Sequence, residues 1–147
     1  MQLTWSEELS VGNVTIDNQH KKLFKLFEKV TSNSELNLDS ILEEIGDYIS
    51  LHFAEEERWM AQVGYPGLIE HRQTHQAFVD STLRLKMDHF LGGKLSAKQL
   101  TRFLQTWLVE HIQINDLQIR QFCLANSEAG QLRTSENPIS EEINKRV

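Results

Sequence analysis

Cysteine is almost absent from this 147-residue chain, which contains a single one, Cys123. One cysteine excludes an internal disulfide and a metal site built from several thiolates. No run of about 18 apolar residues occurs, so no segment is expected to span a membrane. The first eight residues hold neither a basic stretch nor an apolar one, and therefore do not resemble a secretory signal. Together these absences predict a protein of the reducing cytoplasm.

Basic residues are also fewer than acidic residues. Lysine and arginine number 15 against 21 aspartates and glutamates, which gives a formal net charge of -6. This balance disfavours binding to a nucleic acid backbone or to an anionic membrane surface. Apolar residues make up 39% of the chain and charged residues 24%, which is typical of a globular protein. The length suits one domain with one hydrophobic core.

Helical periodicity is the main pattern that the sequence does contain. Apolar residues recur at steps of three and four, which predicts helices over about residues 18–31, 40–63, 68–90 and 96–124. No strand pattern, repeat or low-complexity segment competes with this interpretation. Four helices with short connections predict an all-α fold, namely an antiparallel up-down four-helix bundle.

Capping residues support the helix boundaries. Asp17 is expected to cap the first helix. Ser40 with Glu43, and Ser96 with Gln99, fit the capping-box pattern at the starts of the second and fourth helices. The sequence 64–67, Gly-Tyr-Pro-Gly, predicts the turn that folds the third helix back on the second.

The two ends of the chain lack this pattern. The apolar residues of segment 1–15 show no helical period, so an extended arm is expected there. We place the domain at residues 1–125, followed by a polar tail at 126–147. Within the tail, Asn137-Pro138 is typical of the start of a short helix. A helix of two turns is not stable alone, so the tail would either dock on the bundle or lead into a further output domain.

Side chains able to bind metal recur on the inward faces of all four helices. Residues four apart share one helix face, so His52 and Glu56 point the same way, and so do His71 and His75. Imidazole and carboxylate groups that converge from facing helices are a common way to hold metal in a bundle. The candidate set is His20, His52, Glu56, His71, His75, His111 and Asp116. Asp116 lies about 140° around the helix from His111, which still allows both to border one cavity.

Seven candidates are too many for one tetrahedral zinc ion, and suit two metal ions bridged by carboxylates. The alternative, a set of ordinary core histidines, would bury many polar rings without partners at a cost of several kcal/mol. The donor set suits iron, although manganese, cobalt or zinc could compete. No histidine follows a glutamate by three residues, unlike the carboxylate-rich di-iron enzymes, which disfavours oxygenase chemistry.

Three other residues with ionisable side chains are expected not to bind metal directly. His89 has no metal-binding neighbour three or four residues away, and is interpreted as a solvated histidine. Glu55 and Glu57 flank Glu56 but point about 100° away from its face, which predicts that they are solvated or that they support a metal ligand from behind.

The combination of motifs resembles the bacterial hemerythrin family. The matching stretches span about residues 5–120, and together they are highly specific. They are Val11-Gly12-Asn13, Ile16-Asp17-x-Gln19-His20-Lys21, His52-Phe53-x-x-Glu56-Glu57, Met60 with Gly64-Tyr65-Pro66, His71-x-x-x-His75, and Trp107-x-x-x-His111-Ile112-x-x-x-Asp116.

The resemblance implies a non-haem di-iron centre, with two iron ions joined by an oxo or hydroxo bridge, that binds O2 reversibly. It implies that His71, His75 and His111 hold one iron. It also implies that His20 and His52 hold the other, leaving that iron an open position for O2. The remaining two candidates, Glu56 and Asp116, would bridge the irons.

Helical phase predicts three residues in the wall of the O2 pocket: Ile112, Trp107 and Ile49. Plain core packing is the alternative for all three. The complete bundle suits both an O2 carrier and a sensor. The unfinished polar tail favours a non-enzymatic O2 or redox sensor, the input domain of a bacterial signalling protein with a covalently linked output domain. A free-standing protein for O2 storage or delivery is the first alternative. A di-iron oxidase or peroxidase is the second.

Overall fold

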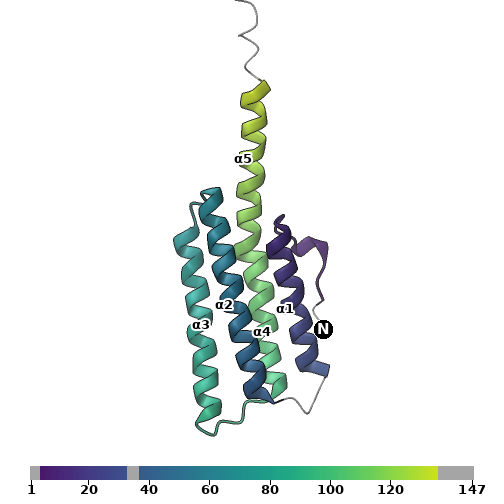
Figure 1. Ribbon diagram of the computed structural model, residues 1–147, viewed down its shortest axis with the longest axis vertical. Coiled ribbons are helices and arrows are strands. Elements are labelled where there is room, and N and C mark those ends of the chain that lie inside the picture. Colours follow the sequence, from purple (N-terminus) through teal and green to yellow (C-terminus); the bar gives the residue numbers. More distant parts are fainter. Residues whose placement is uncertain (1–3, 33–36, 136–147) are drawn as a thin grey trace, which may run out of the picture.

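Four long helices build the protein. The computed structural model describes residues 4–32 and 37–135. In chain order the elements are the 3-10 turn η1 (Glu7–Leu9), α1 (Val14–Ser32), α2 (Leu38–Val63), α3 (Leu68–Phe90), α4 (Ala97–His111), the π-helical turn η2 (Ile112–Asp116) and α5 (Leu117–Ser135). The last three form one continuous rod (Figure 1).

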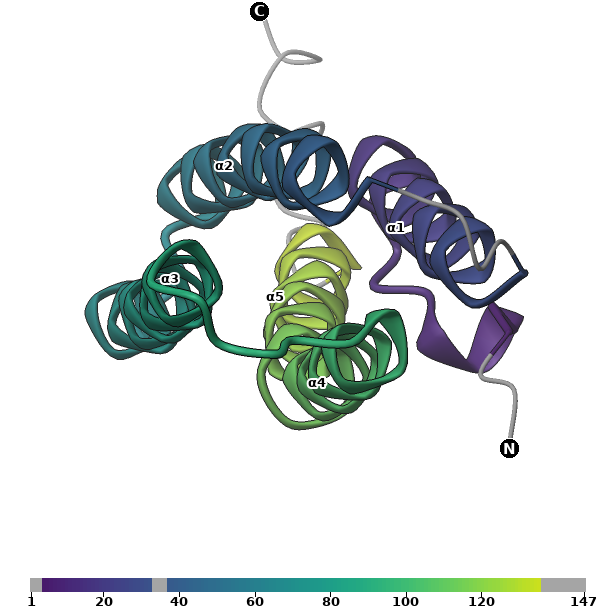
Figure 2. The same ribbon diagram turned by 90° about the horizontal axis from the view of Figure 1, so that it is seen from below.

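The helices alternate in direction, with α1 and α3 running opposite to α2 and α4 (Figure 1). Seen along the bundle, α1 packs on both α2 and α4, and α3 packs on α2 (Figure 2). The all-α, antiparallel up-down four-helix bundle predicted from the sequence is thereby confirmed. The upper part of α5 projects beyond the ends of α1, α2 and α3 (Figure 1).

Apolar stripes from all four helices meet along the bundle axis. Fully or nearly fully buried side chains include Phe27, Ile45 and Leu104, from α1, α2 and α4. Phe78 of α3 stacks on Phe103, with ring centroids 5.6 Å apart and planes 6° apart. Burial of one such side chain stabilises the fold by about 1.5–3 kcal/mol, so the bundle does not depend on any single contact.

The first helix begins four residues earlier than predicted. Asn13, not Asp17, caps α1: its Oδ1 accepts the backbone N–H of Thr15 at 3.0 Å and that of Ile16 at 3.3 Å. Asp17 instead holds the preceding arm, because its carboxylate accepts the Val11 N–H at 2.8 Å and a hydroxyl at 2.7 Å from Ser10. The prediction that Asp17 is the N-cap is therefore wrong. The arm itself is extended apart from the short turn η1.

The second helix also begins earlier than predicted. Asn37 caps α2, with its side chain accepting the N–H of Asp39 at 2.9 Å and of Ser40 at 3.3 Å, so the expected capping box at Ser40 is wrong. The capping box of Ser96 and Gln99 is confirmed at the start of α4.

The fourth helix is longer than predicted. It was expected to end near residue 124, but α5 continues to Ser135. Residues 125–135 contain no proline, and extending an existing helix needs no new nucleation, which explains the continuation. The helix start expected at residues 137–138 lies outside the described residues. Within residues 4–32 and 37–135, no helix has the length and apolar character needed to cross a membrane.

We expect Asp17→Ala to lower the free energy of unfolding of the metal-free protein by about 1–3 kcal/mol, because the buried N–H of Val11 would lose its acceptor. Asp17→Asn, which keeps one side-chain oxygen, should cost less. Urea denaturation followed by circular dichroism measures both. Unchanged stability of the alanine variant would show that the arm does not depend on this carboxylate.

Candidate metal centre

The seven predicted ligands converge at one end of the bundle. They lie early in α1 and α3, late in α2, and at the end of α4 and in η2. These segments meet because neighbouring helices run in opposite directions. All seven are at most 4% exposed. The structure thus brings together every candidate ligand from the sequence.

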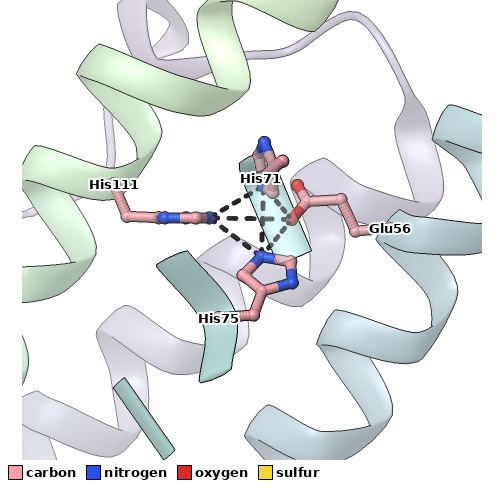
Figure 3. A group of neighbouring side chains, drawn as sticks. All are labelled: Glu56, His71, His75 and His111. Atoms are coloured by element: carbon pink, nitrogen blue, oxygen red, sulfur yellow. Dashed lines mark hydrogen bonds and ion pairs between the residues drawn. The ribbon is translucent and has the colours of Figure 1, made fainter. Parts of the chain in front are cut away.

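Three histidines from two helices form the tightest group (Figure 3). The Nε2 atom of His71 lies 3.1 Å from that of His75 and 3.2 Å from that of His111, and the last two are 3.1 Å apart. Glu56 Oε2 completes the group, at 3.1 Å from His75 and 3.2 Å from His71. Three nitrogens held at about 2.1 Å and right angles by one cation would lie about 3 Å apart, so this spacing suits a shared metal ion.

A second group shares the same glutamate. His20, His52 and Glu56 offer ligand atoms within 4.8 Å of one another. Asp116 lies between the two groups: its Oδ1 is 2.9 Å from His111 Nε2, and its Oδ2 is 3.4 Å from His20 Nε2. The two carboxylates are therefore positioned to be shared between two cations.

A π-helical turn brings Asp116 into the site. In an α-helix, residues five apart differ by about 140° in direction. Between His111 and Asp116 the backbone instead forms the turn η2, whose hydrogen bonds span five residues. Because a π-helical turn holds more residues than an α-helical turn, Asp116 comes back toward the side of His111, and its Oδ1 lies 2.9 Å from His111 Nε2. Both residues are candidates from the sequence, whereas the turn that brings them together is not predicted there.

Several buried atoms of these residues lack a hydrogen-bond partner within the described chain. They are both ring nitrogens of His20, His52 Nε2, Glu56 Oε1 and both oxygens of Asp116. The Asp116 oxygens are close to ring nitrogens, but their angles are not those of hydrogen bonds. Burying unpaired polar atoms is costly, whereas a bound cation would satisfy them. The residues therefore fit two metal ions.

Electrostatics points the same way. Burial by itself would raise the pKa of Glu56, but contacts with His111, His71 and His75 hold that pKa well below its usual value. Burial lowers the pKa of His52 to about 4. Burial would also lower the pKa of His111, but Asp116 and Glu56 outweigh it and raise that pKa to about 9. The metal-free site thus keeps anionic carboxylates and takes up a proton at His111, a position where a cation can replace the proton.

Comparison with known proteins assigns the family. The family described as Hemerythrin HHE cation binding domain matches residues 11–121. The chain belongs to this family. A bacteriohemerythrin of Stenotrophomonas maltophilia (strain R551-3) is 29% identical over 118 residues, covering 78% of this chain and 76% of the relative. A hemerythrin-like protein of Naegleria gruberi is 32% identical over 116 residues, and the match covers 79% of this chain and 89% of that relative.

The fold agrees with solved hemerythrin structures. The structure titled as wild-type hemerythrin superposes with a TM-score of 0.71 at 26% identity, and the match covers 78% of this chain and 92% of that one. The resemblance to hemerythrins and the bundle fold are both confirmed by these comparisons.

Behind the candidate ligands lies a set of supporting hydrogen bonds. Glu57 Oε1 lies 3.0 Å from His75 Nδ1, and the other Glu57 oxygen accepts from Arg72 Nε at 2.8 Å. Gln19 Oε1 lies 3.0 Å from His52 Nδ1. The expectation that Glu57 supports a ligand from behind agrees with this contact, whereas Glu55 meets only Arg58.

Aromatic rings line the three-histidine side. Trp107 stacks on His111, with centroids 4.5 Å apart and planes 15° apart. Phe53 stacks on His75, with ring centroids 3.7 Å apart and planes 6° apart. This contact is not predicted from the sequence, although Phe53 directly follows His52 in the family motif. Ile112 is 0% and Ile49 4% exposed. That Ile112, Trp107 and Ile49 form the wall of an O2 pocket stays a prediction.

His89 lies apart from this site. Its Nε2 is 3.4 Å from Asp39 Oδ1, between the end of α3 and the start of α2, and its side chain is only 25% exposed. The interpretation of His89 as a solvated histidine was therefore incomplete, although its exclusion from the ligand set agrees with the structure.

We expect Glu57→Gln to weaken divalent cation binding about 10- to 100-fold, because His75 would lose an anionic partner that orients it and makes it more basic. Glu55→Gln is the matched control, since it removes only a contact to Arg58 on the surface. Competition with a coloured chelator measures the affinities. Equal affinities for the two variants would show that Glu57 does not support the metal centre.

Proposed function

We propose that this chain binds O2 reversibly at a pair of iron ions held by the seven residues described above. The observation that carries the proposal is the unequal pair of histidine groups, three on one side and two on the other, which share two buried carboxylates. An iron with only two histidines keeps room for an exchangeable ligand. The donor set of imidazole and carboxylate suits iron, and membership of the hemerythrin family supports the same choice.

Each residue has a distinct role in this proposal. His71, His75 and His111 hold one iron, His20 and His52 hold the other, and Glu56 and Asp116 span both. Ferrous iron held by these residues would supply the reversible electron exchange with O2 that such binding requires. The buried position of all seven residues keeps bulk water from the site.

The surrounding side chains restrict what can reach the site. Phe53 and Trp107 cover His75 and His111 with apolar rings. Ile112 and Ile49 are buried nearby in the apolar core. An apolar wall excludes water and admits O2, which carries no charge. A di-iron oxidase or peroxidase remains the alternative, and the preponderance of neutral imidazole over carboxylate ligands speaks against it.

Titration of the iron-loaded protein with O2 tests the proposal. We expect two irons per chain, little colour without O2, and a visible absorption band that appears with O2 and disappears when O2 is removed. A band that does not reverse would favour an oxidase or a redox sensor. Fewer than two irons per chain would contradict the ligand assignment. His111→Ala should lose at least one iron, and His89→Ala, as matched control, should keep both.

We further propose that the domain, residues 1–125, acts as the O2-sensing input of a signalling protein, with α5 as its exit. His111 and Asp116 flank the π-helical turn, and the same rod continues as α5 past the bundle (Figure 1). Single-turn π-helical segments are less regular than α-helix and often occur at functional sites. A change in the two ligands at this turn would therefore act directly on α5. Storage or delivery of O2 is the alternative, and this role would not require α5 to transmit a change from the metal centre.

A movement of α5 caused by the metal centre would alter the contacts at the start of this helix. The Phe122 ring meets Tyr65 edge-on at 5.6 Å, and Arg120 donates to the Ser10 carbonyl at 3.1 Å. These contacts tie α5 to the α2–α3 turn and to the N-terminal arm, both of which lie at the metal end of the bundle. Rotation of α5 would have to break or rearrange them.

Hydrogen exchange of the iron-loaded protein, with and without O2, measures the coupling. We expect amide exchange in residues 117–127 to change when O2 binds, because the π-helical turn would adjust to its two ligands. Residues 38–45 of α2, at the far end of the bundle, serve as the internal control. Identical exchange in 117–127 under both conditions would favour an O2 carrier.

A further inference from the structure

The end of α3 farthest from the metal centre exposes an apolar stripe. Four large side chains there are mostly exposed: Leu83 at 54%, Met87 at 56%, Phe90 at 83% and Leu91 at 76%. Steps of four and three place Leu83, Met87 and Phe90 on one face of the helix, and Leu91 follows as the residue that caps its C-terminal end. We call these four residues the α3 patch. Contiguous exposed apolar side chains of this size mark interaction surfaces.

The described part of the same chain does not reach the α3 patch. The rod α4–α5 leaves the bundle from the opposite end, so α5 points away from it (Figure 1). No described residue therefore covers the patch, and the charges beside it indicate which kind of partner is complementary.

Two exposed residues of opposite charge, Arg84 and Asp88, lie on the same edge of the α3 patch and four residues apart. In an antiparallel helix pair, the same edges of the two helices face each other. If a twofold axis passes beside residue 86, Arg84 of one copy lies level with the partner's Asp88, and Asp88 with the partner's Arg84. The α3 patch is therefore complementary to itself in charge.

The same register also fits the apolar side chains. Measured from residue 86, Met87 lies one residue from the axis and Leu83 three residues on the other side of it. The partner's Met87 then falls between Leu83 and Met87 of the first copy, and the side chains interdigitate rather than meet head-on. Phe90 and Leu91 lie farther out and would cover the two ends of the seam.

On the opposite edge of the α3 patch, this register brings Lys86 near Lys86 of the second copy. There Lys86 lines a groove of about 250 Å³ between α2 and α3, together with Glu43 and Asp47. Glu43 and Asp47 of each copy lie beside its own lysine and would offset the repulsion between the two lysines. Both edges of the stripe are thus electrostatically compatible with a second copy.

We propose that the α3 patch is the interface of a twofold homodimer, in which α3 packs antiparallel on α3 of a second copy of this chain. The contact is small beside the roughly 1,200 Å² of stable specific interfaces, so the dimer should be weak and dependent on concentration. In this arrangement the two metal centres lie at opposite ends, and the two α5 helices point in opposite directions.

Sedimentation equilibrium of the full chain, up to about 1 mM, tests the interface. We expect a monomer–dimer equilibrium. Arg84→Glu alone and Asp88→Arg alone should each weaken association at least tenfold, because each places like charges opposite one another. The double variant Arg84→Glu/Asp88→Arg should restore it. Ile69→Glu is the matched control, since Ile69 is also exposed, at 68%, near the other end of the same helix.

Thiol cross-linking distinguishes this dimer from one formed through α5. Met87→Cys in a Cys123→Ser background should give a covalent dimer with a short bismaleimide, because the two thiols would lie within about two residues of each other along the seam. The native Cys123, on α5, should not cross-link. A chain that stays monomeric, a double variant that does not recover association, or cross-linking through Cys123 would each overturn the proposal.

Discussion

Two buried carboxylates impose the main constraint on this protein. Glu56 and Asp116 are completely buried and ionised, and five histidines surround them. Buried charges without compensation cost several kcal/mol each, and imidazole compensates only when it carries a proton. The metal-free bundle meets this demand in part, through the raised pKa of His111. Two cations bound between these side chains would meet it fully.

This constraint extends into the backbone. In an α-helical rod Asp116 would lie about 140° around the axis from His111, which would hold its carboxylate farther from that histidine. The π-helical turn η2 removes that conflict, at the cost of a less stable hydrogen-bond pattern. The same turn makes α5 a continuation of the metal centre rather than a separate tail. The stability of the exit helix and the geometry of the site are thereby linked through a single turn.

The sequence was sufficient to predict the bundle and to select candidate ligands that the structure brings together, because both depend on spacing. Steps of three and four residues identify a helix face whatever the details of the ends. The caps depend on local competition instead: Asn13 and Asp17 are both good caps, and only the folded arm shows that Asp17 is engaged with Val11. The π-helical turn was beyond prediction, because nothing in Ile112–Asp116 distinguishes it from an ordinary helical turn. The length of α5 was missed because polar composition does not end a helix.

The supporting contacts make the two sides of the centre unequal. His75 has a carboxylate behind it and Phe53 stacked on it, whereas the hydrogen-bond partner of His52 is the neutral amide of Gln19. A carboxylate behind a histidine strengthens it as a metal ligand more than an amide does. In the proposed centre, the three-histidine side would therefore be the better supported of the two. An exchangeable ligand would be expected on the side of His20 and His52, while the other metal ion stayed in place. The far end of α3 would remain free for contacts that do not disturb the centre.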